Sequence, residues 1–166
     1  PVVRVTATMT SVGSTVAGAE GFIDTPPASV NVRGFPFVPK DGAWNSTTEV
    51  GTSDIPLATI NALSAGNHTI YVRGKDAAGN WGVTSTVVIL IDKTAPTFTG
   101  ISIAPSTVSA TASVMMAVNG AADPLLAGLA SGVAGGEYWI GPTAPAPGGG
   151  TPFTGLTPSV PVGALA

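Results

Sequence analysis

Four acidic side chains are the candidates for metal binding in this sequence. Asp76 and Asp92 lie before and after the longest aliphatic run, residues 87–91, and Glu20 and Asp24 lie near the N-terminus. Carboxylate oxygens are the ligands that calcium prefers, so calcium is the ion that these residues would hold. No Asp-x-Asp-x-Asp spacing occurs, and acidic residues at strand ends often cap turns instead. We therefore expect no cofactor, with calcium at Asp76 and Asp92 as the alternative.

Residues in catalytic arrangements are scarce. His68 is the only histidine, and one histidine among scattered Ser, Thr and Asp residues does not define a catalytic triad. Paired carboxylates for glycoside hydrolysis would have to come from nine acidic residues, most of them at expected turns. The sequence therefore predicts a protein that is not an enzyme. A substrate turned over by the chain, with turnover lost on changing Glu20 or Glu137, would contradict this prediction.

Two kinds of side chain point to carbohydrate. Trp44 and Trp139 offer flat rings that can stack on sugars, although Trp139 and Trp81 lie where packing is an equally natural role. Asn45 and Asn67 begin the sequences Asn45-Ser-Thr47 and Asn67-His-Thr69, which are acceptor patterns for N-linked glycans. The sequence thus predicts glycosylation at Asn45 and Asn67, and sugar stacking at Trp44 and Trp139 in a binding protein.

Charge and composition limit the partners. The chain has 166 residues, a formal net charge of −3 and no cysteine, which excludes a basic nucleic-acid surface and a disulfide framework. Its longest aliphatic run is far shorter than the roughly 20 residues of a membrane-spanning helix. From residue 94 onward only Asp123 and Glu137 are ionised. We expect so uncharged a surface to be covered by glycans or neighbouring subunits, unless the module is a naturally low-charge secreted domain.

Turn-forming residues divide the chain into short segments. The chain holds 22 Gly and 15 Pro, and clusters of Gly, Pro, Asn and Asp recur about every 8 to 15 residues. Between them β-branched residues alternate with small polar ones, a pattern typical of antiparallel strands, and helix signals are nearly absent. The predicted strands are residues 2–9, 18–23, 29–32, 55–60, 68–75, 83–92, 99–104, 112–118 and 136–140.

Residues 63–96 carry the most specific pattern. Two predicted strands are joined by Asp76-Ala-Ala-Gly-Asn80, in which Gly79 and Asn80 tolerate positive φ and Asp76 can cap the turn. This stretch resembles the last hairpin and exit linker of bacterial immunoglobulin-like repeats, which occur in tandem in large extracellular and cell-surface proteins. The resemblance implies a β-sandwich of roughly 90 to 100 residues that serves as a spacer, stalk, adhesin module or fibre building block. The expected core and corner residues are Ile70, Tyr71, Val72, Val87, Ile89 and Ile91.

The two halves of the chain share short matches in the same order. Residues 133–140 resemble residues 16–23, which places Glu137 at the position of Glu20, and residues 108–111 and 162–165 resemble 5–8 and 60–63. Pro96 interrupts strand pairing between the copies. We therefore expect an all-β protein of two immunoglobulin-like antiparallel β-sandwich repeats, residues 1–95 and 96–166. The first lacks an opening strand and the second is incomplete at its C-terminus, so a neighbouring segment or molecule is expected to supply strands.

These expectations favour a structural repeat of an extracellular or cell-surface protein. Such modules would assemble end to end, with identical repeats or neighbouring chains as partners, into a glycosylated stalk or filament completed by strand complementation. The alternative is an adhesin or carbohydrate-binding module appended to a secreted protein. The two functions differ at Trp44 and Trp139, which a binding module would expose on a concave face and a fibre repeat would bury.

Overall fold

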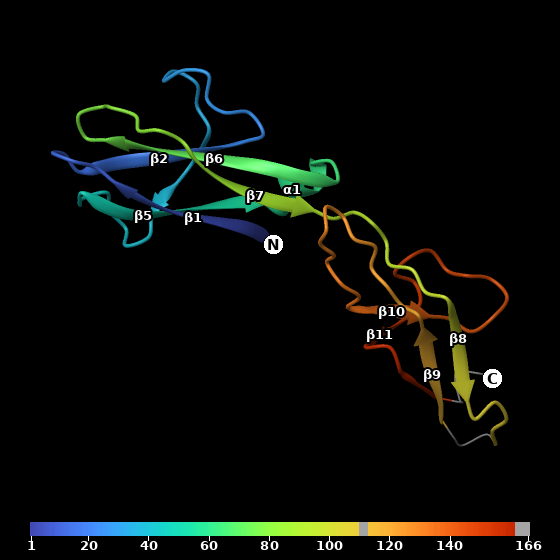
Figure 1. The fold of residues 1–166 in the computed structure, drawn as a ribbon. Coiled ribbons are helices and arrows are strands. Elements are labelled where there is room, and N and C mark those ends of the chain that lie inside the picture. The colour runs from blue at the N-terminus through green and yellow to red at the C-terminus, as the bar shows by residue number, and fades with distance from the viewer. Residues whose placement is uncertain (110–112, 162–166) are drawn as a thin grey trace. The chain divides into compact units, whose positions relative to one another are not determined.

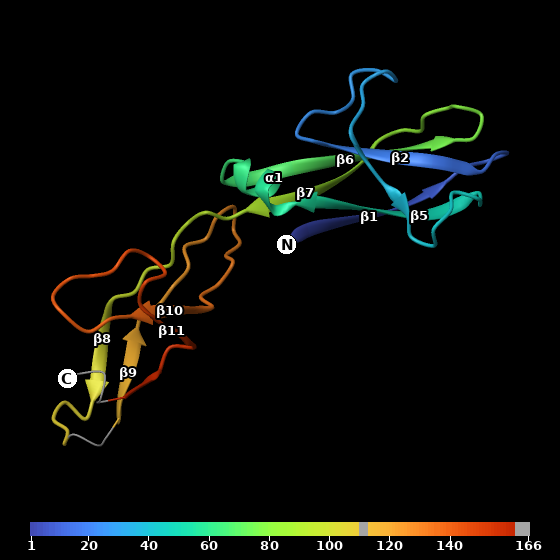
Figure 2. The same cartoon turned by 180° about the vertical axis from the view of Figure 1, so that it is seen from behind.

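The computed structural model describes residues 1–109 and 113–161. The chain divides into two compact units, Pro1–Ile91 and Asp92–Ala166, which we call unit 1 and unit 2. In both units the regular secondary structure is mainly antiparallel strands (Figures 1 and 2), so the prediction of an antiparallel β protein is confirmed at this level. The described residues include one helix, of six residues, and no helix among them has the length and apolarity to cross a membrane.

Unit 1 contains two antiparallel sheets. One has the strand order β1-β5-β4 and the other β3-β2-β6-β7. β1 and β7 therefore lie at sheet edges, where each pairs with a single strand of the described chain. The bounds are β1 (Val2–Thr10), β2 (Val16–Ile23), β3 (Phe35–Pro36), β4 (Val38–Pro39), β5 (Thr48–Pro56), β6 (Gly66–Asp76) and β7 (Ser85–Ile91).

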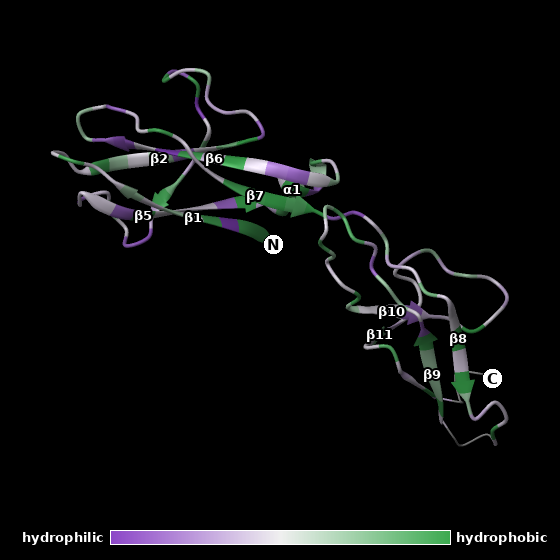
Figure 3. Ribbon diagram, in the orientation of Figure 1, coloured by the Kyte–Doolittle hydropathy of each residue, from purple (hydrophilic) through white to green (hydrophobic). Residues whose placement is uncertain are grey.

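Both sheets of unit 1 contribute to one hydrophobic core. Every second residue of a strand points to the same face, and in β6 the buried Ile70 and Val72 follow this spacing. Figure 3 shows the apolar run along β7, whose last residue, Ile91, reaches the core as predicted. The buried members of the core are Val5, Ala19, Phe37, Ile55, Ile60, Ile70, Val72 and Ile91.

The prediction of a buried Val87 is wrong. Val87 pairs with Ile70, so both side chains lie on the same face of the sheet. Ile70 is 2% exposed, whereas Val87 is 51% exposed. The difference arises because β7 is an edge strand, and only its last residues, Ile89 and Ile91, reach the core.

Two predicted strands are also absent from unit 1. Residues 29–32 form a turn, in which the Ser29 carbonyl accepts the Val32 amide and the Ser29 hydroxyl accepts the Asn31 amide. Residues 55–60 span the end of β5 and the helix α1 (Leu57–Ala62). Pro56 ends the strand, and the run after it contains good helix formers with Ile60 buried in the core.

Unit 2 has two small sheets and a small core. Their orders are β12-β9-β8 and β10-β11. The buried core residues are Val114, Met116 and Val160, with Val108, Tyr138 and Phe153 packed against them. The bounds are β8 (Gly100–Ala104), β9 (Ser113–Asn119), β10 (Gly135–Tyr138), β11 (Thr151–Thr154) and β12 (Ser159–Pro161).

The proposed sequence matches fall unevenly on this structure. Glu20 and Glu137 both lie within strands, β2 and β10. Val5 lies in the middle of β1, but Val108 lies in the segment before β9. The match of residues 60–63 to 162–165 lies outside the described residues.

Changing Ile70 tests this assignment of the core. We expect Ile70→Ala to lower the free energy of unfolding of unit 1 by about 2–5 kcal/mol, because it leaves a cavity among buried side chains. Val87→Ala, at the paired position, is the matched control, and we expect a much smaller loss because Val87 is half exposed. Urea denaturation of the full chain measures both, and equal losses would contradict the assignment.

Candidate functional site

Asp76 caps the turn of the β6–β7 hairpin, as predicted. Its Oδ1 accepts the Asn80 amide at 2.7 Å and its Oδ2 accepts the Asn80 side-chain amide at 3.0 Å. Gly79 has φ 96°, a conformation that glycine adopts without strain. Hydrogen bonds from the Asn80 side chain and then its backbone lower the pKa of Asp76. The carboxylate is therefore engaged by its own turn.

The other calcium candidates also have hydrogen-bond or ion-pair partners within the protein. In unit 2, Asp92 accepts the Thr94 amide at 2.9 Å and the Ser131 amide at 3.3 Å, and these bonds, the Thr94 amide first, lower its pKa. In unit 1, Asp24 bonds to His68, and Glu20 pairs with Arg73. Among residues 1–109 and 113–161, no three His, Cys, Asp or Glu side chains lie close enough together to hold a metal ion.

His68, Asp24 and Ser64 do come together, which the sequence did not indicate. His68 Nδ1 lies 2.6 Å from Asp24 Oδ2, and this bond, followed by one from the Thr69 amide, lowers the pKa of Asp24. His68 Nε2 lies 2.9 Å from the Ser64 carbonyl oxygen and 3.4 Å from its hydroxyl. Nδ1 thus faces a carboxylate, and Nε2 lies closer to the Ser64 carbonyl oxygen than to the hydroxyl that a catalytic histidine would have to activate.

Glu20 and Arg73 form a buried ion pair on the face of the β2–β6 sheet opposite the core. Each of the two residues is 5% exposed, and the pairing of β2 with β6 places them directly opposite each other. Arg73 Nε and Nη2 donate to Glu20 Oε1 at 2.9 and 2.7 Å, and Glu20 Oε2 accepts the Gly34 amide. Arg73 also donates to the Ser29 and Val32 carbonyls, which ties the loop between β2 and β3 to the sheet.

Aromatic rings enclose the same guanidinium. The Arg73 Cζ lies 4.4 Å from the centre of the Trp81 ring and 5.3 Å from that of Phe22. These distances are those of cation–π contacts. Trp81, which follows the hairpin turn, thus packs against a charge.

The two tryptophans proposed for sugar stacking differ from each other. Trp44 is half-buried and packs against the core of unit 1. Trp139 is 49% exposed and lines an apolar groove in unit 2. Asn45, in the segment before β5, and Asn67, near the start of β6, are both exposed, and each belongs to unit 1.

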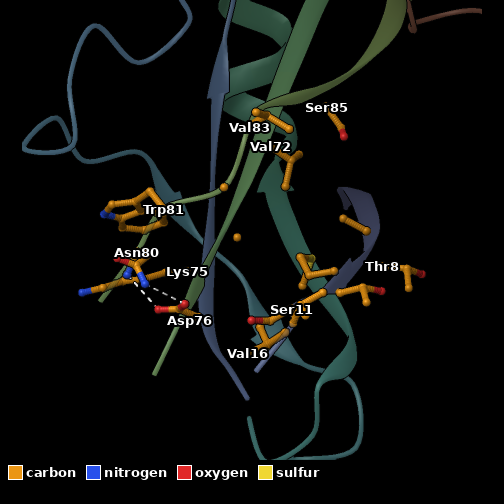
Figure 4. A pocket seen from close by; sticks show the side chains of 16 residues that line it. Thr8, Ser11, Val16, Val72, Lys75, Asp76, Asn80, Trp81, Val83 and Ser85 are labelled. Atoms are coloured by element: carbon orange, nitrogen blue, oxygen red, sulfur yellow. Dashed lines mark hydrogen bonds between the residues drawn. The ribbon is translucent and has the colours of Figure 1, made fainter. Parts of the chain in front are cut away.

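A groove of about 430 Å³ lies between β1 and the start of β7 in unit 1. Figure 4 shows Thr8 and Ser11 on one side of it and Asn80 and Trp81 on another, with Val72, Val83 and Ser85 farther along. β1 and β7 belong to different sheets and are both edge strands. The groove therefore runs beside two strands that each have a free edge in the described structure.

Hydrogen bonds at the ends of β1 show which backbone groups point to its free edge. The Pro1 carbonyl accepts from Leu57 and the Ser11 amide donates to Thr47, both in the direction of β5. Alternate residues of an antiparallel strand bond to the same neighbour, so the odd-numbered residues of β1 bond to β5. The amides and carbonyls of Arg4, Thr6 and Thr8 consequently point to the free edge.

Unit 2 has an apolar groove of about 500 Å³. Its lining comes from both sheets and includes the exposed side chains of Phe98, Ile101 and Ile103, with Val114 and Met116 at its base. The polar groups of the lining are few, Glu137 among them. An exposed apolar surface of this kind is typical of an interaction site.

No family model, curated protein or solved structure matches this chain.

Changing Arg73 tests the buried pair. We expect Arg73→Leu to lower the free energy of unfolding of unit 1 by about 3–5 kcal/mol, because Glu20 is left buried without its counter-ion. The control is Arg4→Leu, which breaks an exposed Arg4–Asp54 pair across β1 and β5 and should change stability little. Urea denaturation measures both changes. The prediction is contradicted if Arg4→Leu lowers the free energy of unfolding as much as Arg73→Leu does.

Asp76 makes the stability of unit 1 depend on pH. Its pKa in the folded chain lies below the ordinary value of 3.8, so the unfolded chain takes up the proton first as pH falls. The stability that the charged cap contributes is present above pH 3.8 and is lost as pH falls through the folded pKa. We expect Asp76→Asn to be less stable than the native chain at pH 7 and the difference to shrink toward pH 2 in chemical denaturation. A constant difference across this range would contradict the role of the charge.

Proposed function

We propose that this chain is a structural module of an extracellular or cell-surface protein, built on immunoglobulin-like β-sandwiches and assembled by strand complementation. The observation that carries the proposal is the free edge of β1 beside the groove that leads to the edge strand β7. An exposed edge of this kind is a template for an added strand.

The strand order of unit 1 supports the immunoglobulin-like part of the proposal. In that fold one sheet has the order A-B-E-D, and the other contains C, F and G. With β1 as strand B, the order β1-β5-β4 corresponds to B-E-D, and β2-β6-β7 corresponds to C-F-G. The empty position beside β1 is then that of strand A.

The strand order of unit 2 supports one choice of strand for this position. There β8 pairs antiparallel with β9, and β9 pairs on its other side with β12. If β9 corresponds to β1 and β12 to β5, β8 occupies the place that is empty beside β1. The occupant we propose for unit 1 is therefore an extended strand of the β8 type, supplied by another repeat.

The surface chemistry supports a structural over a carbohydrate-binding role. Trp44 packs against the core, and the groove that contains Trp139 offers few polar groups to bond sugar hydroxyls. His68 Nε2 lies 2.9 Å from the Ser64 carbonyl oxygen and 3.4 Å from its hydroxyl, a geometry that gives little support to activation of this serine. The exposed Asn45 and Asn67 suit covalent glycans, and few charged groups lie in unit 2, as expected of a surface in contact with neighbours.

Adding a strand peptide to the full chain tests the proposal. The probe is a synthetic peptide with the sequence of residues 97–106, which contains β8. We expect it to slow hydrogen exchange at the amides of Arg4, Thr6 and Thr8, because these point to the free edge. The amides of Val3 and Val5, which already bond to β5, should not change.

The matched control is the same peptide with Ser102→Pro. Proline removes the amide that strand pairing requires at this position, so this peptide should give no protection. The proposal fails if the native peptide protects none of the three amides, or if both peptides act equally.

A further inference from the structure

Glu137 in unit 2 is held in the same way as Glu20 in unit 1. Glu20 lies opposite Pro36 of the neighbouring strand, and its Oε2 accepts the amide of Gly34, two residues before that proline. Glu137 lies opposite Pro152, and its Oε2 accepts the amide of Gly150, again two residues before the proline. The local geometry around the two carboxylates is therefore shared.

The two glycines have the same steric role. A Cβ on Gly34 would lie 2.0 Å from the Gly21 carbonyl oxygen, and one on Gly150 would lie 2.9 Å from that of Tyr138. Gly21 and Tyr138 each directly follow the glutamate. In both units the absence of a side chain lets the loop approach the strand and donate its amide.

The units differ at the other edge of the glutamate strand. In unit 1, β6 pairs with β2 and places Arg73 directly opposite Glu20. In unit 2, β10 pairs with β11 and with no further strand of the described residues. Residues 92–166 contain no arginine, and the hydrogen bonds of the Glu137 carboxylate come from the Gly148 and Gly150 amides. The position opposite Glu137 is open.

Trp139 completes the comparison. It follows Glu137 by two residues, as Phe22 follows Glu20, and it lies directly after the last residue of β10. In unit 1 the guanidinium of Arg73 lies over the Phe22 ring, whereas Trp139 is 49% exposed. Unit 1 holds the Arg73 guanidinium between a carboxylate and an aromatic ring. Unit 2 presents the same two kinds of group, the Glu137 carboxylate and the larger ring of Trp139.

We propose that β10 receives a β-strand that carries an arginine opposite Glu137, as one strand of a hairpin of the β6–β7 type. This inference rests on the proposed function and names the partner of unit 2. The added strand runs antiparallel to β10, its guanidinium pairs with Glu137 and stacks on Trp139, and its alternate apolar residues cover Ile101, Ile103 and the rest of the apolar groove. The 49% exposure of Trp139 is then explained by a cation that occupies its ring face on assembly.

The probe is a synthetic peptide with the sequence of residues 66–91, which contains β6, its turn and β7. We expect it to bind the full chain and to slow hydrogen exchange at the amides of β10. Replacing its arginine, Arg73→Gln, should weaken binding by about 10- to 100-fold, the range for a lost charge-assisted hydrogen-bonded pair. Isothermal titration calorimetry gives the dissociation constants.

A double-mutant cycle separates the ion pair from general strand addition. With Glu137→Gln in the full chain, the native peptide should bind as weakly as the Arg73→Gln peptide, and combining both changes should cost little more. Asp123→Asn is the matched control, because Asp123 also accepts a loop amide in unit 2, that of Gly132, but lies outside β10. It should leave binding unchanged, and Trp139→Ala should weaken it.

The outcomes distinguish this inference from the proposed function. If the peptide binds at β10 with the same dissociation constant whether or not Glu137 and the peptide arginine are replaced, the arginine pairing is overturned. Protection confined to unit 1, or no binding, would overturn β10 as the receptor strand. The β1-edge experiment with residues 97–106 does not involve Glu137, so its result stands independently of either outcome.

Discussion

A β-strand at a sheet edge has hydrogen-bond partners on one side only, and the arrangement of both units depends on where such edges lie. In unit 1 the edges β1 and β7 belong to different sheets and border one groove. Both sheets contribute residues to the core, whereas Val87 on the edge strand β7 lies outside it and is half exposed. In the described part of unit 2, β10 and β11 form a sheet of two strands, and an apolar groove is lined by residues of both sheets.

The buried charges of unit 1 lie away from its hydrophobic core. The Glu20–Arg73 pair lies on the side of its sheet opposite the core and is enclosed by Phe22, Trp81 and the loop carbonyls of Ser29 and Val32. A buried pair contributes little net stability compared with apolar packing, but it penalises any register that separates the charges. In a sheet of repetitive small and β-branched residues, that penalty distinguishes the correct pairing of β2 with β6 from its shifted alternatives.

The sequence predicts strands well where local chemistry determines them. The β6–β7 hairpin follows from Asp76, Gly79 and alternating apolar residues, and the structure confirms its turn cap. The sequence does not predict β3, β4, β11 and β12, because each has two to four residues, contains proline and exists only through its partner. Likewise, the contact of His68 with Asp24 joins residues far apart in the chain, so the spacing of residues in the sequence does not predict it. The apolar run of β7 predicts a buried Val87, but this residue is half exposed because β7 lies at a sheet edge, a position that hydropathy does not reveal.

The ends of β1 and β7 have a mechanical consequence. Pro1, which bonds to the start of α1, and Ile91, which pairs with Gly66, lie at the same end of unit 1 (Figure 1). A strand added antiparallel to β1 would enter at the opposite end, near Thr10, some 30 Å away for a nine-residue strand. Tension between that entry point and Ile91 would run along the strands. The ladder bonds would then be loaded together in shear, rather than opened one after another as they would be by tension between Pro1 and Ile91.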